Sequence, residues 1–429
     1  LFITAFLFFF LLLNSAVTAQ PKTDTLLRLI LNNAKDSLID KVINEPFNYR
    51  CQIIYTQINR DKNNKPHFVN YYFNYDSLLY FNPASMVKLP AAILALEKLN
   101  NLHLKGINKY TIIQFDSSYK GQKKAYTDSS SKGGKPTIAH YIKRAFLISE
   151  NDPYNRLYQF LGQQTFNREL AAKGYKDVRI TRQFMSFTSE QNRHTNPVRF
   201  VRKNGLLLYQ QPPLYNTDTF DFSRKILLGK AHYNRNDSLI KTPFDFTEHN
   251  NISLLALQQI LQAVLFPASV PPQQRFNLKK DDYRFLYRYL SQYPSETEYP
   301  KYDTSVFYDG YVKFFFRNET YRMPEQIRVF NKVGWSYGFL TDVSYVVDFK
   351  NKVEYMLSAT LYVNNDEVLN DGKYDYETIG YPILYKLGQI VYQYELKRSR
   401  QYKPNLSHFK LNYKKRKNDN RPVLKEVDN

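Results

Sequence analysis

Cysteine is nearly absent from this chain, since only Cys51 occurs among 429 residues. A single thiol cannot form an intrachain disulfide, so an exported protein of this kind must be stabilised by its core. Cys51 lies in the apolar run 51–55, which favours a buried strand position over a lipid anchor or a catalytic thiol. The seven histidines show no metal-binding signature, and we expect neither a metal nor a cofactor.

Acidic residues are also scarce: 39 Asp and Glu oppose 60 Lys and Arg, which gives a net charge of +21. In a cytosolic protein this charge would suggest nucleic acid as a partner. Residues 1–13, however, are almost wholly apolar, and residues 15–19 end in a V-x-A pattern that is typical of a cleaved secretory signal. We therefore expect a signal peptide over residues 1–19, a periplasmic protein, and no nucleic-acid partner. The alternative, an uncleaved membrane anchor, is disfavoured because the run falls short of the ~20 apolar residues that span a bilayer.

Much of the positive charge lies near the C-terminus, where residues 397–429 hold eleven Lys or Arg against three Asp or Glu. This composition predicts a solvated, disordered basic tail over residues 399–429. The alternative is a segment that docks on an anionic envelope surface.

Helical and strand-like patterns alternate along the rest of the chain, without internal repeats. Apolar residues have helical spacing over 24–43, 138–161, 252–265 and 376–396. Runs rich in β-formers cover 50–59, 68–75, 339–349 and 353–363. This order predicts an α/β protein in which the two ends of the chain share one sheet and the middle forms an all-helical lobe.

An S-x-x-K sequence occurs five times, and Ser85 differs from the other four because strong helix formers follow it. The i, i+3 spacing places Lys88 on the same helix face as Ser85, at the end where free N–H groups favour a developing anion. A serine hydroxyl becomes a good nucleophile only when a base takes its proton, and a lysine can do so if burial lowers its pKa. We predict Ser85 as nucleophile and Lys88 as base.

Two further motifs complete the candidate site. Ser149 and Asn151 end a helical run, where the hydroxyl can relay a proton and the amide can hold Lys88 or the substrate. Lys332 opens a β-rich region and can bind a substrate carboxylate, while Gly334 allows a close backbone approach. Taken singly, each has a structural alternative: a helix cap for Ser149, a turn for Asn151, and a solvated charge for Lys332.

The combination resembles the penicillin-recognising serine enzymes, and most closely their class A β-lactamase branch. The resemblance spans about residues 24–396 and is specific at three segments: 81–90, 148–152, where Glu replaces Asp in S-D-N, and 332–336, where Val replaces Thr in K-T-G. It implies a five-stranded antiparallel sheet flanked by helices and packed against a helical lobe, with the site between them. It also implies an oxyanion hole from the backbone N–H groups of Ser85 and Trp335.

The chain departs from that pattern in two ways. Val333 lacks the hydroxyl that helps the family bind the substrate carboxylate, and no E-x-x-L-N segment supplies a glutamate to activate the deacylating water. Glu190 lies in about the right region for this role, although an exposed loop acid is an equal alternative. Slow deacylation is therefore expected.

The expected domain covers residues 20–398, with an α/β lobe at 20–80 and 325–398 and a helical lobe at 81–324. Segments of about 199–251 and 271–328 look inserted. Three functions fit a monomeric protein of this kind: a β-lactamase-like hydrolase, a peptidoglycan D-alanyl peptidase-like enzyme, and a penicillin-fold binding protein without turnover.

Overall fold

The computed structural model describes residues 21–176, 178–318, 322–413 and 423–427. The expected signal peptide and the densest part of the basic tail lie outside these ranges. Within them, every helix is too short or too polar to cross a bilayer.

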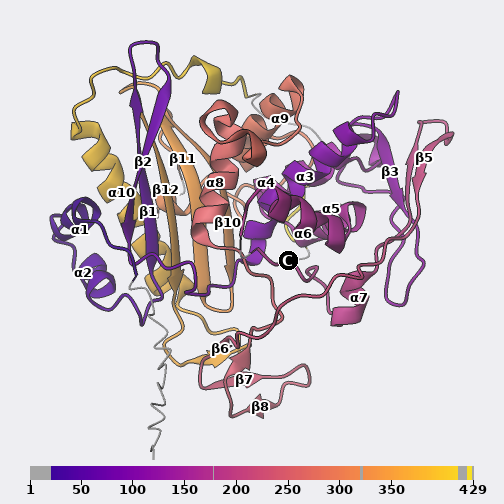
Figure 1. Ribbon diagram of the computed structural model, residues 1–429, viewed down its shortest axis with the longest axis horizontal. Helices are drawn as coiled ribbons and strands as arrows, with labels where there is room; N and C mark the ends of the chain where they lie inside the picture. The colour runs from indigo at the N-terminus through magenta and orange to yellow at the C-terminus, as the bar shows by residue number, and fades with distance from the viewer. Residues whose placement is uncertain (1–20, 177, 319–321, 414–422, 428–429) are drawn as a thin grey trace, which may run out of the picture.

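A five-stranded antiparallel sheet dominates the structure, as predicted (Figure 1). Its order is β10–β11–β12–β1–β2, so strands from both ends of the chain lie side by side. The strands are β1 (Gln52–Arg60), β2 (Pro66–Phe73), β10 (Ile327–Ser336), β11 (Phe339–Asp348) and β12 (Val353–Tyr362). All ten residues of β11 are buried, because helices cover both faces of the sheet. Strand β10 forms one edge, and this edge borders the helical lobe.

Three helices cover the outer face of the sheet: α1 (Thr25–Asn32), α2 (Ser37–Asn44) and α10 (Tyr381–Lys397). The single helix expected over 24–43 is therefore two. Lys35 has a φ of 48° between them, and the Asp36 side chain caps α2 by accepting from the N–H groups of Leu38 and Ile39. A π-helical turn, Tyr376–Gly380, precedes α10.

The helical lobe lies on the other side of the sheet. Its helices are α3 (Lys88–Asn101), α4 (Ile138–Leu147), α5 (Asn151–Leu161), α6 (Gln163–Ala172), α7 (Ser189–Arg193), α8 (Leu254–Leu265) and α9 (Lys280–Ser291). Short 3₁₀ turns accompany them: η1 (Ala84–Val87), η2 (Lys132–Gly134), η3 (Pro267–Ser269), η4 (Pro272–Gln274) and η5 (Pro294–Glu296). A further 3₁₀ turn, η6 (Phe314–Phe316), packs instead against α10.

The expectation that this lobe is all-helical is wrong, because it also carries small sheets. One has the order β3 (Ile112–Phe115), β4 (Val198–Val201), β5 (Leu207–Gln211). A second has the order β13 (Val368–Leu369), β7 (Ala231–Tyr233), β8 (Leu239–Ile240), and β6 (Leu227–Leu228) pairs with β9 (Phe244–Asp245). Most of these strands come from the segment 199–251. They are short and lack a long alternating pattern, so the sequence gives little sign of them.

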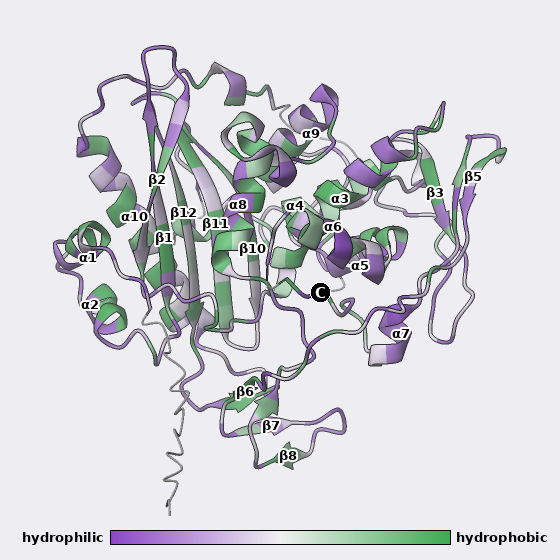
Figure 2. Cartoon of the chain, viewed as in Figure 1, coloured by the Kyte–Doolittle hydropathy of each residue, from purple (hydrophilic) through white to green (hydrophobic). Residues whose placement is uncertain are grey.

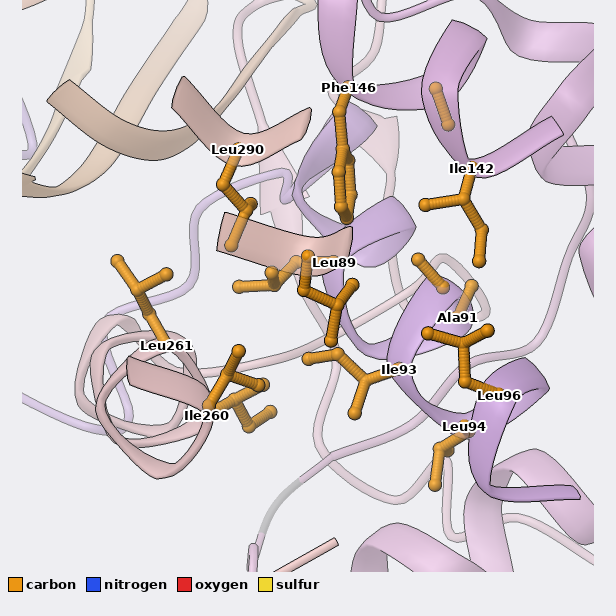
Figure 3. Packing of buried hydrophobic residues seen from close by; sticks show 14 of the residues in the cluster. Leu89, Ala91, Ile93, Leu94, Leu96, Ile142, Phe146, Ile260, Leu261 and Leu290 are labelled. Carbon is orange, nitrogen blue, oxygen red and sulfur yellow. The ribbon is translucent and has the colours of Figure 1, made fainter. Parts of the chain in front are cut away.

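Helix α3 runs through the middle of the lobe and fixes the position of the candidate site. Figure 3 shows its residues Leu89, Ile93 and Leu96 among side chains of α4, α8 and α9. Figure 2 shows that hydrophobic residues concentrate on α3 and the central strands, whereas the peripheral α7 is largely hydrophilic. Pro90 lies in the first turn of α3, where its missing N–H has no intrahelical partner to lose.

The C-terminal segment differs from the expected disordered tail where the structure describes it. A 3₁₀ turn, η8 (Ser407–Phe409), brings Leu406 and Phe409 into buried positions. The Phe409 ring packs against Phe266, Phe330 and Tyr345. Leu406 and Phe409 thus fix this basic stretch to the core, although its overall composition is polar and charged.

Candidate active site

Ser85 lies in the 3₁₀ turn η1, directly before α3. Ala84 precedes it with a φ of 43°, and the Asn82 side chain accepts a hydrogen bond of 2.8 Å from the Ala84 N–H. Strand β10 packs tightly against this turn, because a Cβ added to Gly334 would lie 2.6 Å from the carbonyl oxygen of Pro83. The glycine therefore allows the nucleophile segment to approach β10 closely, while the approach of a substrate backbone that the sequence suggested stays a prediction.

Lys88 begins α3 and is completely buried. Its Nζ lies 2.7 Å from Ser85 Oγ, 2.8 Å from Asn151 Oδ1 and 3.5 Å from Ser149 Oγ, and it also donates to the Ser149 carbonyl. Burial lowers the pKa of Lys88 well below its usual range, the positive charge of Lys332 lowers it further, and Glu150 opposes the shift. A neutral amine beside Ser85 is the arrangement that a general base requires.

Ser149 lies at the break between α4 and α5, where one helix had been expected over 138–161. Its φ of 70° is in the left-handed region that a non-glycine residue rarely adopts. This conformation ends α4 and turns the Ser149 hydroxyl toward two lysine amino groups: Lys332 Nζ donates to it at 2.7 Å, and Lys88 Nζ lies 3.5 Å from it. The serine is therefore placed between the base and the predicted substrate anchor.

Lys332 projects from β10 and is only 2 % exposed. Its Nζ also donates to its neighbour's carbonyl, Val333 O, at 2.6 Å. Burial lowers the pKa of Lys332 well below its usual range; Asp342 opposes this shift and Lys313 adds to it. An anion that enters the cavity would favour the charged form of Lys332, so proton uptake should accompany the binding of a carboxylate.

A buried polar network that the sequence did not reveal lies behind Lys332. Lys313 donates to Asn331 Oδ1 at 2.6 Å, and Asn331 donates to Asp342 Oδ1 at 2.9 Å. Ser344 also donates to Asp342, at 2.7 Å. Desolvation raises the pKa of the Asp342 carboxyl and lowers that of the Lys313 ammonium. The residues are scattered in sequence, and only the pairing of β10 with β11 and the turn η6 bring them together.

Glu150, which replaces the Asp of the resembled S-D-N segment, is buried and is not among the residues that line the cavity at Ser85. Arg144 donates to its carboxylate through two nitrogens, and the buried Tyr302 hydroxyl donates to its other oxygen. Arg144 also pairs with Asp128 at 2.7 Å. These contacts fix the turn that carries Ser149, so Glu150 has a structural role.

Trp335 follows Gly334 on β10 and lines the cavity. Its ring packs edge-on against Tyr311 and Phe314, with centroid separations of 6.0 and 5.8 Å. This packing holds the end of β10 beside Ser85, where the expected oxyanion hole would form.

Glu190 does not reach the site. It lies on α7 with its side chain 53 % exposed, pairs with His194 at 3.1 Å, and is not among the residues that line the cavity. The position of a glutamate in sequence could not show on which side of the lobe a short helix would place it. Glu190 is therefore an exposed acid, which was the alternative interpretation to a deacylation base, and it does not contact Ser85.

A cavity of about 510 Å³ opens above Ser85. Its lining residues include Ser85, Ser149, Asn151, Trp335 and a wall that the sequence reasoning missed, formed by Arg182, Gln183, Phe184, Met185, Ser186, His249, Asn250 and Tyr337. Among the lining residues that the structure describes, none is Asp or Glu. The described part of the chain also has no group of three His, Cys, Asp or Glu side chains that could hold a metal ion.

Comparison with known proteins shows one family match. The family described as "Beta-lactamase enzyme family" matches residues 34–207, a segment that contains Ser85, Lys88, Ser149 and Asn151. No curated protein matches the chain significantly.

Solved structures of three bacterial β-lactamases are similar to this chain at 12 % identity. The protein from Burkholderia phymatum has a TM-score of 0.47, with 85 % of this chain and 98 % of that chain covered. For the protein from Burkholderia ambifaria the TM-score is 0.46, with coverage of 85 % and 100 %. For the protein from Sphaerobacter thermophilus the TM-score is 0.44, with coverage of 86 % and 97 %. Residues 34–207 are thus similar to the β-lactamase enzyme family, and the structure brings three residues of this segment, Ser85, Lys88 and Ser149, together with Lys332 from outside it.

Proposed function

We propose that this protein opens β-lactams or related amides through an acyl-enzyme on Ser85, in the manner of class A enzymes but with slow deacylation. The observation that carries this proposal is the continuous set of contacts from Ser85 through Lys88 and Ser149 to Lys332. Each of these groups has a task in acyl transfer that its position allows.

In the proposed acylation step, neutral Lys88 takes the proton of Ser85 as the serine oxygen attacks the amide carbonyl. The oxyanion that forms accepts hydrogen bonds from the backbone N–H groups of Ser85 and Trp335. Ser149 then passes a proton to the leaving nitrogen, and Lys332 holds the carboxylate on the leaving side. The carbonyl–oxygen bond to Ser85 forms as the carbonyl–nitrogen bond breaks.

Deacylation needs a water molecule and a base, and the described lining of the cavity offers no carboxylate for this purpose. The wall above Lys88 carries the Phe184 ring, whose centroid lies 5.1 Å from Lys88 Nζ. An apolar ring at this position excludes water rather than activating it. The same observation supports a second candidate, a peptidoglycan D-alanyl peptidase-like enzyme, in which an amine replaces water as the acceptor or hydrolysis is slow.

Mass spectrometry of the intact protein after brief incubation with benzylpenicillin tests the proposal. A persistent adduct on wild-type protein that is absent from Ser85→Ala supports an acyl-enzyme with slow deacylation. Rapid release of the opened product from unmodified protein supports efficient β-lactamase turnover. If neither adduct nor product forms, the protein is a binding module and the proposed function is wrong.

A further inference from the structure

The cavity wall carries a further basic side chain, Arg182, in addition to the Lys332 amine that contacts Ser149. Its guanidinium donates to His249 Nε2 at 2.8 Å, and both residues line the cavity. Within the described part of the chain, no carboxylate forms an ion pair with Arg182. Half-buried arginines in proteins are usually paired, so a guanidinium that meets only a neutral ring is available to a ligand.

His249 is held in the neutral form that can accept this hydrogen bond. Burial lowers its pKa to about 3, and the charge of Arg182 contributes to that shift. The rings of Phe244, Phe246 and Tyr337 surround the imidazole, with centroid separations from 5.0 to 5.9 Å. The imidazole therefore acts as a fixed acceptor that orients the guanidinium without neutralising it.

The backbone of Arg182 is fixed as firmly as its side chain. Its N–H donates to Asn250 Oδ1 at 3.0 Å, and its carbonyl accepts from the Tyr154 hydroxyl at 3.1 Å. The next two residues are held in the same way, by Asn192 at Gln183 and by Asn155 at Phe184. Side-chain amides thus pre-organise the whole wall, as a binding surface requires.

Lys332 lies in the middle of the edge strand β10, whereas Arg182 lines the cavity together with Ser336 at the C-terminal end of that strand. Lys332 is four residues before Ser336, which corresponds to about 13 Å at about 3.3 Å per strand residue. Ser336 and Tyr337 line the cavity beside Arg182 and His249, and the Tyr337 ring contacts His249. An extended substrate laid along this edge would meet Lys332 with its leaving side and Arg182 with its acyl side.

We propose that Arg182 is a specificity-determining residue that binds an acidic group on the acyl side of the substrate. This inference rests on the proposed acyl transfer at Ser85 and names its substrate class: an amide with one carboxylate on the leaving side and a second anionic group on the acyl side. A cavity with Arg182 in its wall and no Asp or Glu among its described lining residues attracts a dianion more strongly than a monoanion.

Two penicillins that differ by one carboxylate test this inference. Carbenicillin carries a carboxylate on the acyl side chain, and benzylpenicillin lacks it. We expect wild-type protein to be acylated about tenfold faster by carbenicillin, measured as the second-order rate constant of adduct formation. The preference should shrink as salt is raised from about 0.05 to 0.5 M, because ions screen the attraction.

Arg182→Gln should remove the preference, by lowering the rate constant for carbenicillin about tenfold more than that for benzylpenicillin. Arg168→Gln is the matched control, because this exposed arginine pairs with Asp218 outside the cavity, and it should keep the wild-type ratio. Acylation of Arg182→Gln by benzylpenicillin shows that the variant is folded.

Equal rates for the two compounds with wild-type protein, or an equal loss of both in Arg182→Gln, would overturn the role of Arg182 and leave acylation at Ser85 intact. Acylation by neither compound would instead reject the proposed function, and this inference with it.

Discussion

Gly334 and Pro83 pack so closely that residue 334 has no room for a side chain, since a Cβ on the glycine would lie 2.6 Å from the proline carbonyl oxygen. Strand β10 and the nucleophile turn therefore meet backbone to backbone. Because both atoms at this contact belong to structured backbone, neither can move without shifting Ser85 or Trp335.

Gly334→Ala should consequently reduce acylation by benzylpenicillin by about 10²-fold, since a misplacement of about 1 Å at the reacting atoms can cost this much. Gly310→Ala is the control, because a Cβ there would meet its nearest neighbours at 3.6 Å, an ordinary contact. Adduct formation followed by mass spectrometry measures both. A Gly334→Ala variant with wild-type rates would show that the site tolerates a wider spacing.

The acylation rate should rise with pH as Lys88 loses its proton, and this rise should lie well below pH 10.5, because burial lowers the pKa of Lys88. Lys332→Gln removes a nearby positive charge, so the pKa of Lys88 should increase and the rise should move to higher pH. The pH profile of the second-order acylation rate constant measures this. A rise at the same or a lower pH in Lys332→Gln would exclude Lys88 as the titrating base.

The same two lysines should make the fold more stable as pH increases. Their pKa values are lower in the folded than in the unfolded chain, so the unfolded chain binds more protons, and the free energy of unfolding rises with pH up to about the unfolded value. Urea unfolding between pH 7 and 9 should show this slope in wild-type protein and a smaller slope in Lys88→Met. Identical slopes in both proteins would mean that Lys88 titrates normally.

Glu150→Gln should destabilise the fold by about 3 kcal/mol, because it leaves the largely buried Arg144 without its full carboxylate partner. Glu190→Gln, at an exposed position, should change the free energy of unfolding by less than about 0.5 kcal/mol. Chemical denaturation measures both. We also expect Glu190→Gln to leave the lifetime of the acyl-enzyme unchanged; a longer lifetime would restore Glu190 as a candidate base.

The sequence predicted the parts of the site that depend on local spacing. Ser85 and Lys88 are three residues apart at a helix start, so their proximity follows from helix geometry. Ser149 and Lys332 could be recognised only as members of a motif set, because their positions depend on a left-handed turn and on strand pairing. Arg182 and His249 carry no motif: the wall they form depends on side-chain amides from α5, α7 and the segment before α8.

For the fold, the long periodic elements were predicted and the breaks within them were not. Lys35 and Ser149 both have positive φ and divide what looks like one helix into two, although neither is a glycine. The short strands of the segment 199–251 have two to five residues each, too few for an alternating pattern to be visible.

The packing of Phe409 limits how far the protein can be shortened from its C-terminus without exposing core residues. A fragment that stopped after α10 would uncover the aromatic faces of Phe266, Phe330 and Tyr345, and these line the seam between the sheet and the lobe. The folding unit therefore extends at least to residue 409, and a boundary drawn by charge composition alone would cut through it.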